Sequence, residues 1–461
     1  MNPIDPPFLP SRRRALQAAS SGFGYLAFSA LSTMRARADA NPLAPRHGHF
    51  QGTAKRVIFL AMQGGPSHLD TFDYKPKLNK DSGKAAGRNF SKLLGSPFEF
   101  SQHGESGLPI SELFPRIAGH ADDLCLINSM HTDIPNHPQA TTQMHTGNFQ
   151  FVRPSLGAWS LYGLGTENES LPGFVTLAPP NGAQNYGSAF LPAIYQGTPI
   201  GKGGRNRFAS QADAAPVSNI ANPKLSREMQ RIQLDFVNSL NREKLARDQF
   251  HPEVEGIIES YELAFRMQDE LPGVLDISSE PQHIRDLYGL DDSTTGGFAR
   301  QCLGARRLAE AGVRFIQLNH GNWDHHRNLR NGITQRCAEI DQPIAALLAD
   351  LKQRDMLRDT LIIWAGEFGR TAHGQNSDGR DHNNKGYTIW MAGGGVRGGI
   401  RHGLTDEYGA QAIADKVHIH DWHATILHLL GLNHEQLTYR YAGRDFRLTD
   451  VHGNVVKGIL A

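Results

Sequence analysis

The sequence predicts an α/β fold in which helices cover both faces of a mostly parallel central sheet, with a helical insertion. Short apolar runs alternate with longer amphipathic segments in the second half of the chain, and most apolar runs end in glycine or polar residues. Alternation of strand and helix favours parallel strands, because each connection crosses back over the sheet. A chain of 461 residues is compatible with one large α/β domain.

The expected strands and helices follow from these apolar patterns. The first strand is expected over residues 55–62, where an apolar run closes at a turn of the type Gln-Gly-Gly-Pro. A short strand is expected over 124–127. Further strands are expected over residues 313–318, 360–364 and 387–391, and helices over 299–311, 333–351 and 422–430. Gly312 and Gly431 follow two of these helices and provide natural C-caps.

Residues 223–290 differ in character from the rest. Ser226 to Asn241 and Val254 to Asp269 show helical periodicity with many charges. They predict a mostly helical insertion within a single domain that spans residues 41–461.

The first forty residues predict an export signal. A twin arginine at Arg12 and Arg13 precedes a mildly apolar stretch, 15–31, and small residues at 36–40 offer cleavage sites. The twin arginine favours the Tat route, and hence a periplasmic or extracellular location. An uncleaved N-terminal anchor is the alternative, although the stretch is short and rich in Ser and Gly for a membrane span. We expect no stable span in the mature chain.

Charge and cysteine content exclude two other classes. Lys+Arg 47 against Asp+Glu 46 gives a net charge of +1, which argues against a nucleic-acid-binding protein. The three cysteines contain no CxxC pair, so neither a disulfide framework nor a thiolate zinc site is expected. Cys125, Cys302 and Cys337 are interpreted as free thiols, with a Cys302–Cys337 disulfide as the alternative.

Polar residues able to bind metal follow the predicted strands. Asp324 and His326 come after the strand 313–318, and in an extended segment they face the same side while His325 points away. His382 lies in a polar segment that leads into the strand 387–391. Carboxylate and imidazole are ligands for Zn²⁺, Mn²⁺ or Fe. Loops at successive strand ends converge at one edge of a sheet, so a metal site is predicted there.

The surrounding residues leave two interpretations open. Glu367 or Asp381 would orient a ligating histidine as a second-layer carboxylate. Alternatively, Asp324 only caps a helix that begins near His326, and Glu367 pairs with Arg370 in a structural ion pair.

The segment 132–147 is a further candidate. Asn136-His137-Pro138 predicts a turn, and Pro138 suits the first turn of a helix. The N-terminus of such a helix favours an anion such as phosphate or sulfate, and a plain capped helix is the alternative.

Several of these motifs together resemble a known family. They are Gly64-Gly65-Pro66-Ser67-His68-Leu69-Asp70-Thr71-Phe72-Asp73, Gly321-Asn322-Trp323-Asp324-His325-His326, Gly366-Glu367-Phe368-Gly369-Arg370-Thr371, Gly379-Arg380-Asp381-His382 and Gly443-Arg444-Asp445-Phe446-Arg447-Leu448-Thr449-Asp450. The chain resembles the secreted, uncharacterised family catalogued as domain of unknown function 1501, within the alkaline phosphatase and sulfatase superfamily. The resemblance covers nearly all of the mature chain and implies an alkaline-phosphatase-like fold.

The superfamily implies a metal pocket with known components. Its members typically hold two metal ions beside a Ser, Thr or modified Cys nucleophile. Asp324, His326 and His382 resemble its first metal site, whereas Gln63 and Glu367 stand where the second site usually has other residues. The expected pocket therefore holds one ion, or an unusual pair of ions. The candidate ligands for the second ion are Asp70, His68 and Asp381.

The nucleophile position departs from the superfamily. Met144-His145-Thr146-Gly147 resembles the end of the sulfatase nucleophile helix, and counting back by the sulfatase spacing reaches His137. No Ser, Thr or Cys stands at that position. His137, with Glu367 and Arg370, is therefore the catalytic candidate, as nucleophile or general acid/base.

The resemblance implies an exported metal-dependent hydrolase, a sulfatase or phosphatase acting on a small-molecule or polysaccharide ester. The expected cofactor is a divalent metal, zinc or manganese. The alternative is a non-catalytic member of the same fold that binds a glycan or a protein. A metal-dependent mutase or transferase is a third possibility, and it would need a phosphoenzyme residue.

Overall fold

The apolar runs of the sequence form the strands of one central sheet. The computed structural model describes residues 42–85, 91–180, 182–201, 224–248, 252–376 and 378–461. Within these residues, nine strands lie in the order β12-β4-β11-β8-β1-β7-β5-β6, with β15 paired to β4. Their bounds are β1 Arg56–Met62, β4 Leu124–His131, β5 Phe174–Leu177, β6 Thr198–Ile200, β7 Phe315–His320, β8 Thr360–Ala365, β11 Tyr387–Ala392, β12 Ile400–His402 and β15 Val417–His418.

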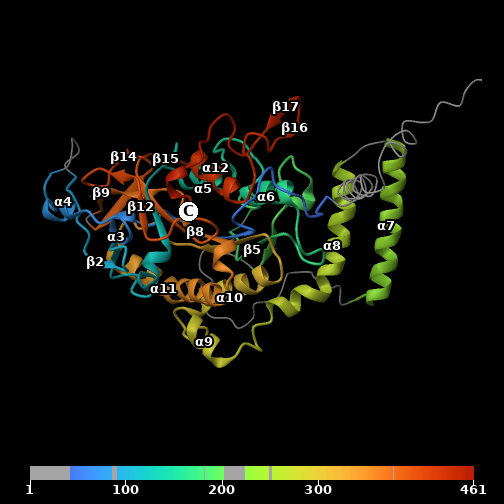
Figure 1. Ribbon diagram of the computed structural model, residues 1–461, viewed down its shortest axis with the longest axis horizontal. Coiled ribbons are helices and arrows are strands. Elements are labelled where there is room, and N and C mark those ends of the chain that lie inside the picture. Colours follow the sequence, from blue (N-terminus) through green and yellow to red (C-terminus); the bar gives the residue numbers. More distant parts are fainter. Residues whose placement is uncertain (1–41, 86–90, 181, 202–223, 249–251, 377) are drawn as a thin grey trace, which may run out of the picture.

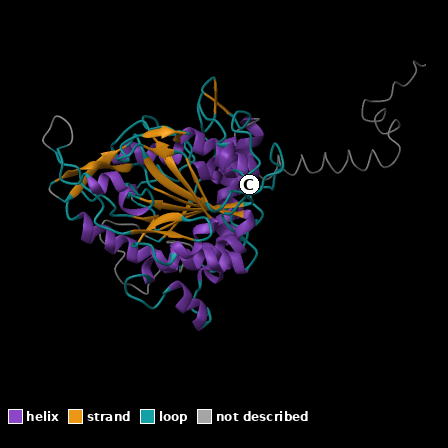
Figure 2. Ribbon diagram, turned by 60° about the vertical axis from the view of Figure 1, so that its left-hand side comes forward, coloured by secondary structure: helices purple, strands orange, loops and turns teal. Residues whose placement is uncertain are grey.

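Helices cover both faces of this sheet, as Figures 1 and 2 show. The helices α9, α10 and α11 lie on one side, and α5, α6 and α12 lie on the other. Their bounds are α5 His137–Thr146, α6 Leu156–Leu164, α9 Gln282–Tyr288, α10 Gly296–Glu310, α11 Leu329–Gln353 and α12 Ile419–Leu429. The predicted fold class, a mostly parallel α/β sheet between helical layers, is confirmed.

The centre of the sheet determines where the loops meet. Strand β1 lies between β7 and β8 and is parallel to both, so Met62 pairs with His320 and Ala61 with Ala365. The three strands are almost completely buried, because both faces are covered. Their carboxyl ends align, and the loops that follow them lie next to one another at one edge.

The strand β11 is antiparallel to its neighbours β8 and β4. Its amino end at Tyr387 therefore lies at the edge where β8 ends. The segment before it forms strand β10, Gly379–Asn383, which pairs antiparallel with β9, Gly369–Gln375. Both segments were expected as loops. They are strands that carry no apolar run, and their hairpin brings His382 opposite Arg370.

The smaller elements surround this framework. They are the helices α3 His68–Thr71 and α4 Pro76–Lys80, the 3-10 turns η1 Ile117–Asp123, η2 Ala193–Tyr195, η3 Leu357–Asp359 and η4 Lys457–Ile459, and the hairpins β2 Phe100–His103 with β3 Leu108–Ser111, β13 Leu404–Thr405 with β14 Ala412–Ala414, and β16 Tyr439–Tyr441 with β17 Arg444–Phe446. The longer predicted helices and strands match observed ones, with ends displaced by a few residues.

Two long helices stand at one end of the molecule, α7 Arg227–Asp248 and α8 Pro252–Leu275 (Figure 1). Apart from Ser226, they contain the two segments for which helices were predicted, 226–241 and 254–269. The candidate export signal at residues 1–40 lies outside the described residues. None of the helices in the described part of the chain combines the length and apolar character needed to cross a bilayer.

All three cysteines are buried free thiols, so the alternative Cys302–Cys337 disulfide is not formed. Burial raises the pKa of Cys125 to about 12 and raises the pKa of Cys302 and Cys337 well above the ordinary value. These cysteines are packing residues.

A buried ion pair joins helix α3 to the β9–β10 hairpin. Asp70 accepts two hydrogen bonds from Arg380, at 2.8 and 3.1 Å, and both side chains are fully buried. We predict that Asp70→Ala lowers the free energy of unfolding by about 3–5 kcal/mol, because it leaves a buried guanidinium unpaired. Urea denaturation measures this loss. Glu407→Ala, which removes an exposed partner of Lys77, is the control and should change stability little.

Two fully buried histidines make stability depend on pH. Burial lowers the pKa of His145 and of His423 to about 3, against about 6.5 when unfolded. Their contribution to the free energy of unfolding is complete above pH 6.5. It is lost as the pH falls towards 3, because the unfolded chain then binds more protons than the folded chain. We predict that His145→Leu reduces the slope of unfolding free energy against pH by about 1.4 kcal/mol per pH unit between about pH 6 and 4.

Urea titrations at several pH values measure that slope. The matched control is His47→Leu, at an exposed position, which should leave the slope unchanged. An unchanged slope in His145→Leu would contradict the assignment of a buried neutral imidazole.

Candidate metal centre

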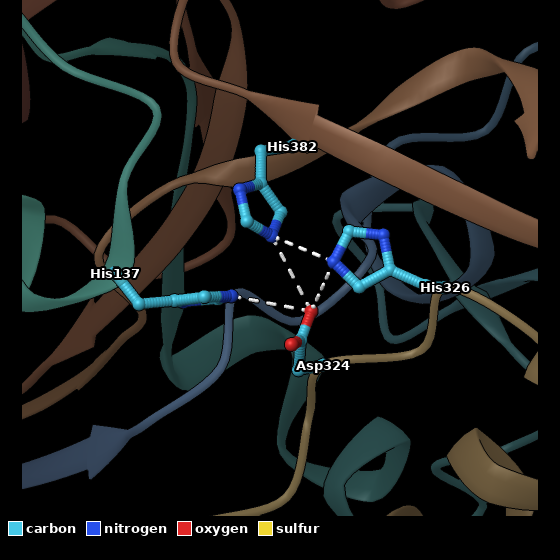
Figure 3. A group of neighbouring side chains, drawn as sticks. All are labelled: His137, Asp324, His326 and His382. Carbon is cyan, nitrogen blue, oxygen red and sulfur yellow. Dashed lines mark hydrogen bonds and ion pairs between the residues drawn. The ribbon is translucent and has the colours of Figure 1, made fainter.

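Four side chains from three parts of the chain converge at the carboxyl edge of the sheet. His137 is the first residue of α5, Asp324 and His326 lie in the loop after β7, and His382 lies on β10. One donor atom from each lies within 4.8 Å of the others. Figure 3 shows the three rings directing a nitrogen towards the carboxylate of Asp324.

The spacing of these donor atoms suits a small divalent ion. Asp324 Oδ1 lies 3.2, 2.9 and 3.4 Å from Nε2 of His137, His326 and His382. The Nε2 atoms of His326 and His382 are 2.9 Å apart. A tetrahedral zinc with bond lengths of about 2.0–2.1 Å places neighbouring donors roughly 3.3 Å apart. Three imidazoles and one carboxylate form a ligand set that zinc accepts.

The outer nitrogen of each imidazole is held by an acceptor. His137 Nδ1 donates to Glu367 Oε1 at 2.6 Å, and His382 Nδ1 donates to the Pro135 carbonyl at 2.8 Å. His326 Nδ1 is bonded to the side-chain oxygen of Gln375. Carboxylate and carbonyl oxygens only accept, so each Nδ1 carries a proton and each Nε2, when deprotonated, offers its lone pair to the cluster.

The Nε2 atom of His137 gives the most direct indication that an ion or a water molecule binds between these side chains. This atom is buried and makes no hydrogen bond of suitable geometry among the described residues. A buried polar atom without a partner destabilises the protein unless water or an ion satisfies it. The residues present therefore fit a divalent cation.

Glu367 lies behind the cluster and positions His137. Its side chain is 1% exposed, and its two oxygens accept the backbone N–H of Gly64 at 2.9 and 3.2 Å. Gly64 has a positive φ, and a Cβ there would lie 2.7 Å from the backbone nitrogens of Trp323 and Asp324. Only glycine therefore lets the loops after β1 and β7 approach this closely.

Arg370 joins the loops of the site. Its guanidinium donates to Asp324 Oδ1 at 2.7 Å, to the Gly65 carbonyl at 2.8 Å and to the Arg380 carbonyl at 3.2 Å, and it also bonds to the Gly64 carbonyl. The side chain is 1% exposed. Arg370 and Glu367 were predicted as catalytic residues, but their burial favours positioning roles. The alternative Glu367–Arg370 ion pair is replaced by pairs with His137 and Asp324.

The field of the site attracts positive charge. Burial opposes protonation of His137, but the neighbouring carboxylates of Asp324 and Glu367 outweigh burial and raise its pKa to about 9. Burial raises the pKa of Asp324, but the adjacent side chains of His137, His382 and Arg370 hold it well below its ordinary range. A divalent cation among these donors would displace the proton of His137.

The loop after β7 is fixed by a buried tryptophan. Trp323 is fully buried, its Nε1 donates to His320 Nδ1 at 3.0 Å, and its backbone N–H donates to the Gln63 carbonyl. Asp324 does not cap a helix, because α11 begins at Leu329 with Asn328 as N-cap. His325 lies outside the cluster, as expected, and packs close to Gly332 of α11.

Three predicted ligands do not join the cluster. Asp70 is saturated by Arg380, and His68 is buried with Nε2 donating to the Gly409 carbonyl at 2.9 Å. Asp381 accepts the backbone N–H of His382, and its carboxylate stays 3.9 Å from His326 Nδ1. Among the described residues, the group able to hold a metal consists of His137, Asp324, His326 and His382.

His137 was expected as nucleophile or general acid/base, and its place among the ligands was missed. The predicted helix start at Pro138 is confirmed, since α5 begins at His137 and has Pro138 in its first turn. An anion at this helix end stays a prediction. His137 and Asp324 are far apart in the sequence, so no local motif predicts that they lie next to each other.

We predict that Glu367→Gln weakens zinc binding by about 10–100-fold, because it removes the charged acceptor that fixes the tautomer of His137. Titration calorimetry on protein stripped with a chelator measures this affinity. Asp381→Asn changes a more exposed carboxylate near the same site and should bind zinc nearly as the wild type does. Equal affinities for wild type and Glu367→Gln would contradict the positioning role of Glu367.

Solved structures of several enzymes resemble the fold at low identity. The sulfatase PsFucS1 from Pseudoalteromonas sp. is 13% identical, with 94% of this chain and 75% of that chain covered and a TM-score of 0.37. Ps i-CgsB in complex with k-i-k-neocarrahexaose is 10% identical, covering 83% and 72%, with a TM-score of 0.38. Alkaline phosphatase from the Antarctic bacterium TAB5 is 10% identical, covering 83% and 99%, with a TM-score of 0.35.

At TM-scores below 0.5 these likenesses give no basis for assigning an activity, which must come from the residues of the site. No curated protein matches the sequence. The model of one family, described as "Protein of unknown function (DUF1501)", matches residues 54–460, nearly the whole chain. The predicted family is therefore confirmed, and this protein belongs to the DUF1501 family.

Proposed function

We propose that this protein is an exported hydrolase that uses one divalent metal ion to cleave a sulfate or phosphate ester. The observation that carries the proposal is the convergence of three imidazole nitrogens and one carboxylate oxygen, each imidazole being held from behind by an acceptor. Export rests on the sequence of residues 1–40 alone.

The chain's own residues give the ion a fixed cradle. A divalent ion would supply Lewis-acid polarisation of an ester oxygen and would acidify a water molecule. Asp324 is the most open ligand, with 43% of its side chain exposed, so the cluster faces solvent on that side. Buried Arg370 behind Asp324 offsets part of the negative charge and holds the carboxylate in place.

The surroundings support a single ion. Gln63 donates from its side chain to Asn319 at 3.1 Å, and Glu367 is engaged by Gly64 and His137. Asp70 is neutralised by Arg380. These side chains have no free charged oxygen facing the cluster. Zinc is the ion that we propose first, because three nitrogens and one oxygen match its ligand preference; manganese is the second.

A non-catalytic binding protein is the second candidate, and one observation favours it. By the sulfatase spacing, His137 stands where a nucleophile is expected, yet its Nδ1 is bound to Glu367 and its Nε2 points at Asp324. Its imidazole is therefore committed to the metal cluster. A protein without another nucleophile would use the same pocket to hold a glycan or a protein.

We predict about one zinc, manganese or iron per chain in protein purified without added metal or chelator, measured by elemental analysis. Asp324→Ala/His326→Ala should lose the metal because it removes two of four ligands. Asp133→Ala/His418→Ala is the matched control: it removes a similarly exposed Asp–His pair, 3.2 Å apart, outside the cluster. Metal-free wild type that is well folded would contradict the metal centre.

Activity is tested on the same proteins with aryl phosphate and aryl sulfate esters. Hydrolysis by wild type and the Asp133/His418 control, lost in the Asp324/His326 variant, would support the hydrolase. Stoichiometric metal with no turnover of a broad set of sulfate and phosphate esters would overturn the hydrolase and favour the binding protein.

A further inference from the structure

Helix α7 exposes four large apolar residues to solvent on one of its faces. Met229, Ile232, Phe236 and Leu240 are 46%, 54%, 64% and 49% exposed. Their spacing of three and four residues places them on one face, about three turns long. This set of four residues is called the α7 stripe below.

The opposite face of α7 packs on α8 through polar contacts. Arg231 donates to both oxygens of Glu262 at 2.8 Å, and Asn238, 1% exposed, donates to Glu262 at 2.6 Å. Gln268 of α8 donates to Gln230 at 3.0 Å. A surface helix normally buries its apolar face and exposes its polar face. In α7 this arrangement is reversed, so its apolar stripe is available to a partner.

The position of α7 leaves the stripe open. Figure 1 places α7 beyond α8 at one end of the molecule, far from the sheet and the metal centre. Contiguous exposed apolar patches on soluble proteins mark interaction sites. A partner could therefore approach without meeting the rest of the fold.

Three charged residues of α7 lie beside the stripe, and their order indicates what kind of surface is complementary to it. Glu228, Asp235 and Arg242 recur every seven residues and so line one flank of the stripe. Asp235 is paired within the helix with Arg231, at 2.6 Å. Glu228 and Arg242 are exposed. Neither forms a close ion pair with another described residue, and Arg242 interacts only at longer range with Glu259 of α8. This flank of α7 therefore carries an acidic residue, Glu228, near the start of the helix and a basic residue, Arg242, further towards its end.

A second copy of the same helix is complementary to this pattern only when it runs antiparallel. A two-fold axis near Asp235 would bring Glu228 of one copy beside Arg242 of the other, twice, while the two stripes meet. The two Asp235 carboxylates would lie near the axis, each neutralised by Arg231 of its own helix. In a parallel pair the two copies of this flank would lie on opposite sides of the contact, so Glu228 would not meet Arg242. We propose that the α7 stripe is a self-association surface through which two copies of this chain pair with antiparallel α7 helices.

Sedimentation equilibrium of the full chain tests the proposal. We expect a monomer–dimer equilibrium over roughly 1–200 µM protein, since a helix pair is a small interface. Phe236→Glu should weaken the dimer at least about tenfold, because it places a charge in the apolar contact. Val451→Glu, at a position 70% exposed elsewhere on the surface, is the matched control and should not change it.

Charge exchange tests the antiparallel geometry. Glu228→Arg and Arg242→Glu should each weaken the dimer, and the double exchange should restore it, since opposite charges meet again. Circular dichroism checks that each variant keeps its helices. A wild type that stays monomeric throughout the range would overturn the proposal and favour a different protein or a lipid surface. A dimer insensitive to Phe236→Glu, or no recovery in the double exchange, would overturn it as well.

Discussion

The site depends on the hydrogen bonds of the buried Arg370 guanidinium. The guanidinium donates to carbonyls of the loop after β1, to Asp324 in the loop after β7 and to a carbonyl of β10. A charge buried this deeply is stable only when its donors are satisfied and an opposite charge is near. The backbone of three segments and the carboxylate of Asp324 are therefore held in one geometry, and the histidines gather around that carboxylate.

The parallel sheet makes this geometry possible. Because β1 lies between β7 and β8, the loops that carry Gly64, Asp324 and Glu367 are neighbours before any side chain interacts. Antiparallel β11 adds His382 from the hairpin that precedes it. The resulting cluster has tautomers fixed by outer hydrogen bonds and a field that favours a cation, the two properties that a metal ligand set requires.

Much of this arrangement was predictable from the sequence, and what was missed has a physical cause. The apolar runs identify the strands of the buried sheet, so the sequence alone predicts that Asp324, His326 and His382 lie together. The hairpin β9–β10 lacks an apolar run and was expected as loop. Asp70 and His68 carry side chains suited to a metal, but burial commits them to Arg380 and Gly409. His137 joins the cluster only through tertiary contacts, which no local pattern encodes.

X-ray absorption spectroscopy at the zinc edge, on zinc-loaded protein, tests the proposed metal centre. We expect four light donors at about 2.0–2.1 Å, with the multiple-scattering signal of three imidazoles, from His137, His326 and His382. His137→Ala should reduce that signal to two imidazoles. A spectrum dominated by oxygen donors, by sulfur, or by fewer than three imidazoles in the wild type would contradict the proposed centre.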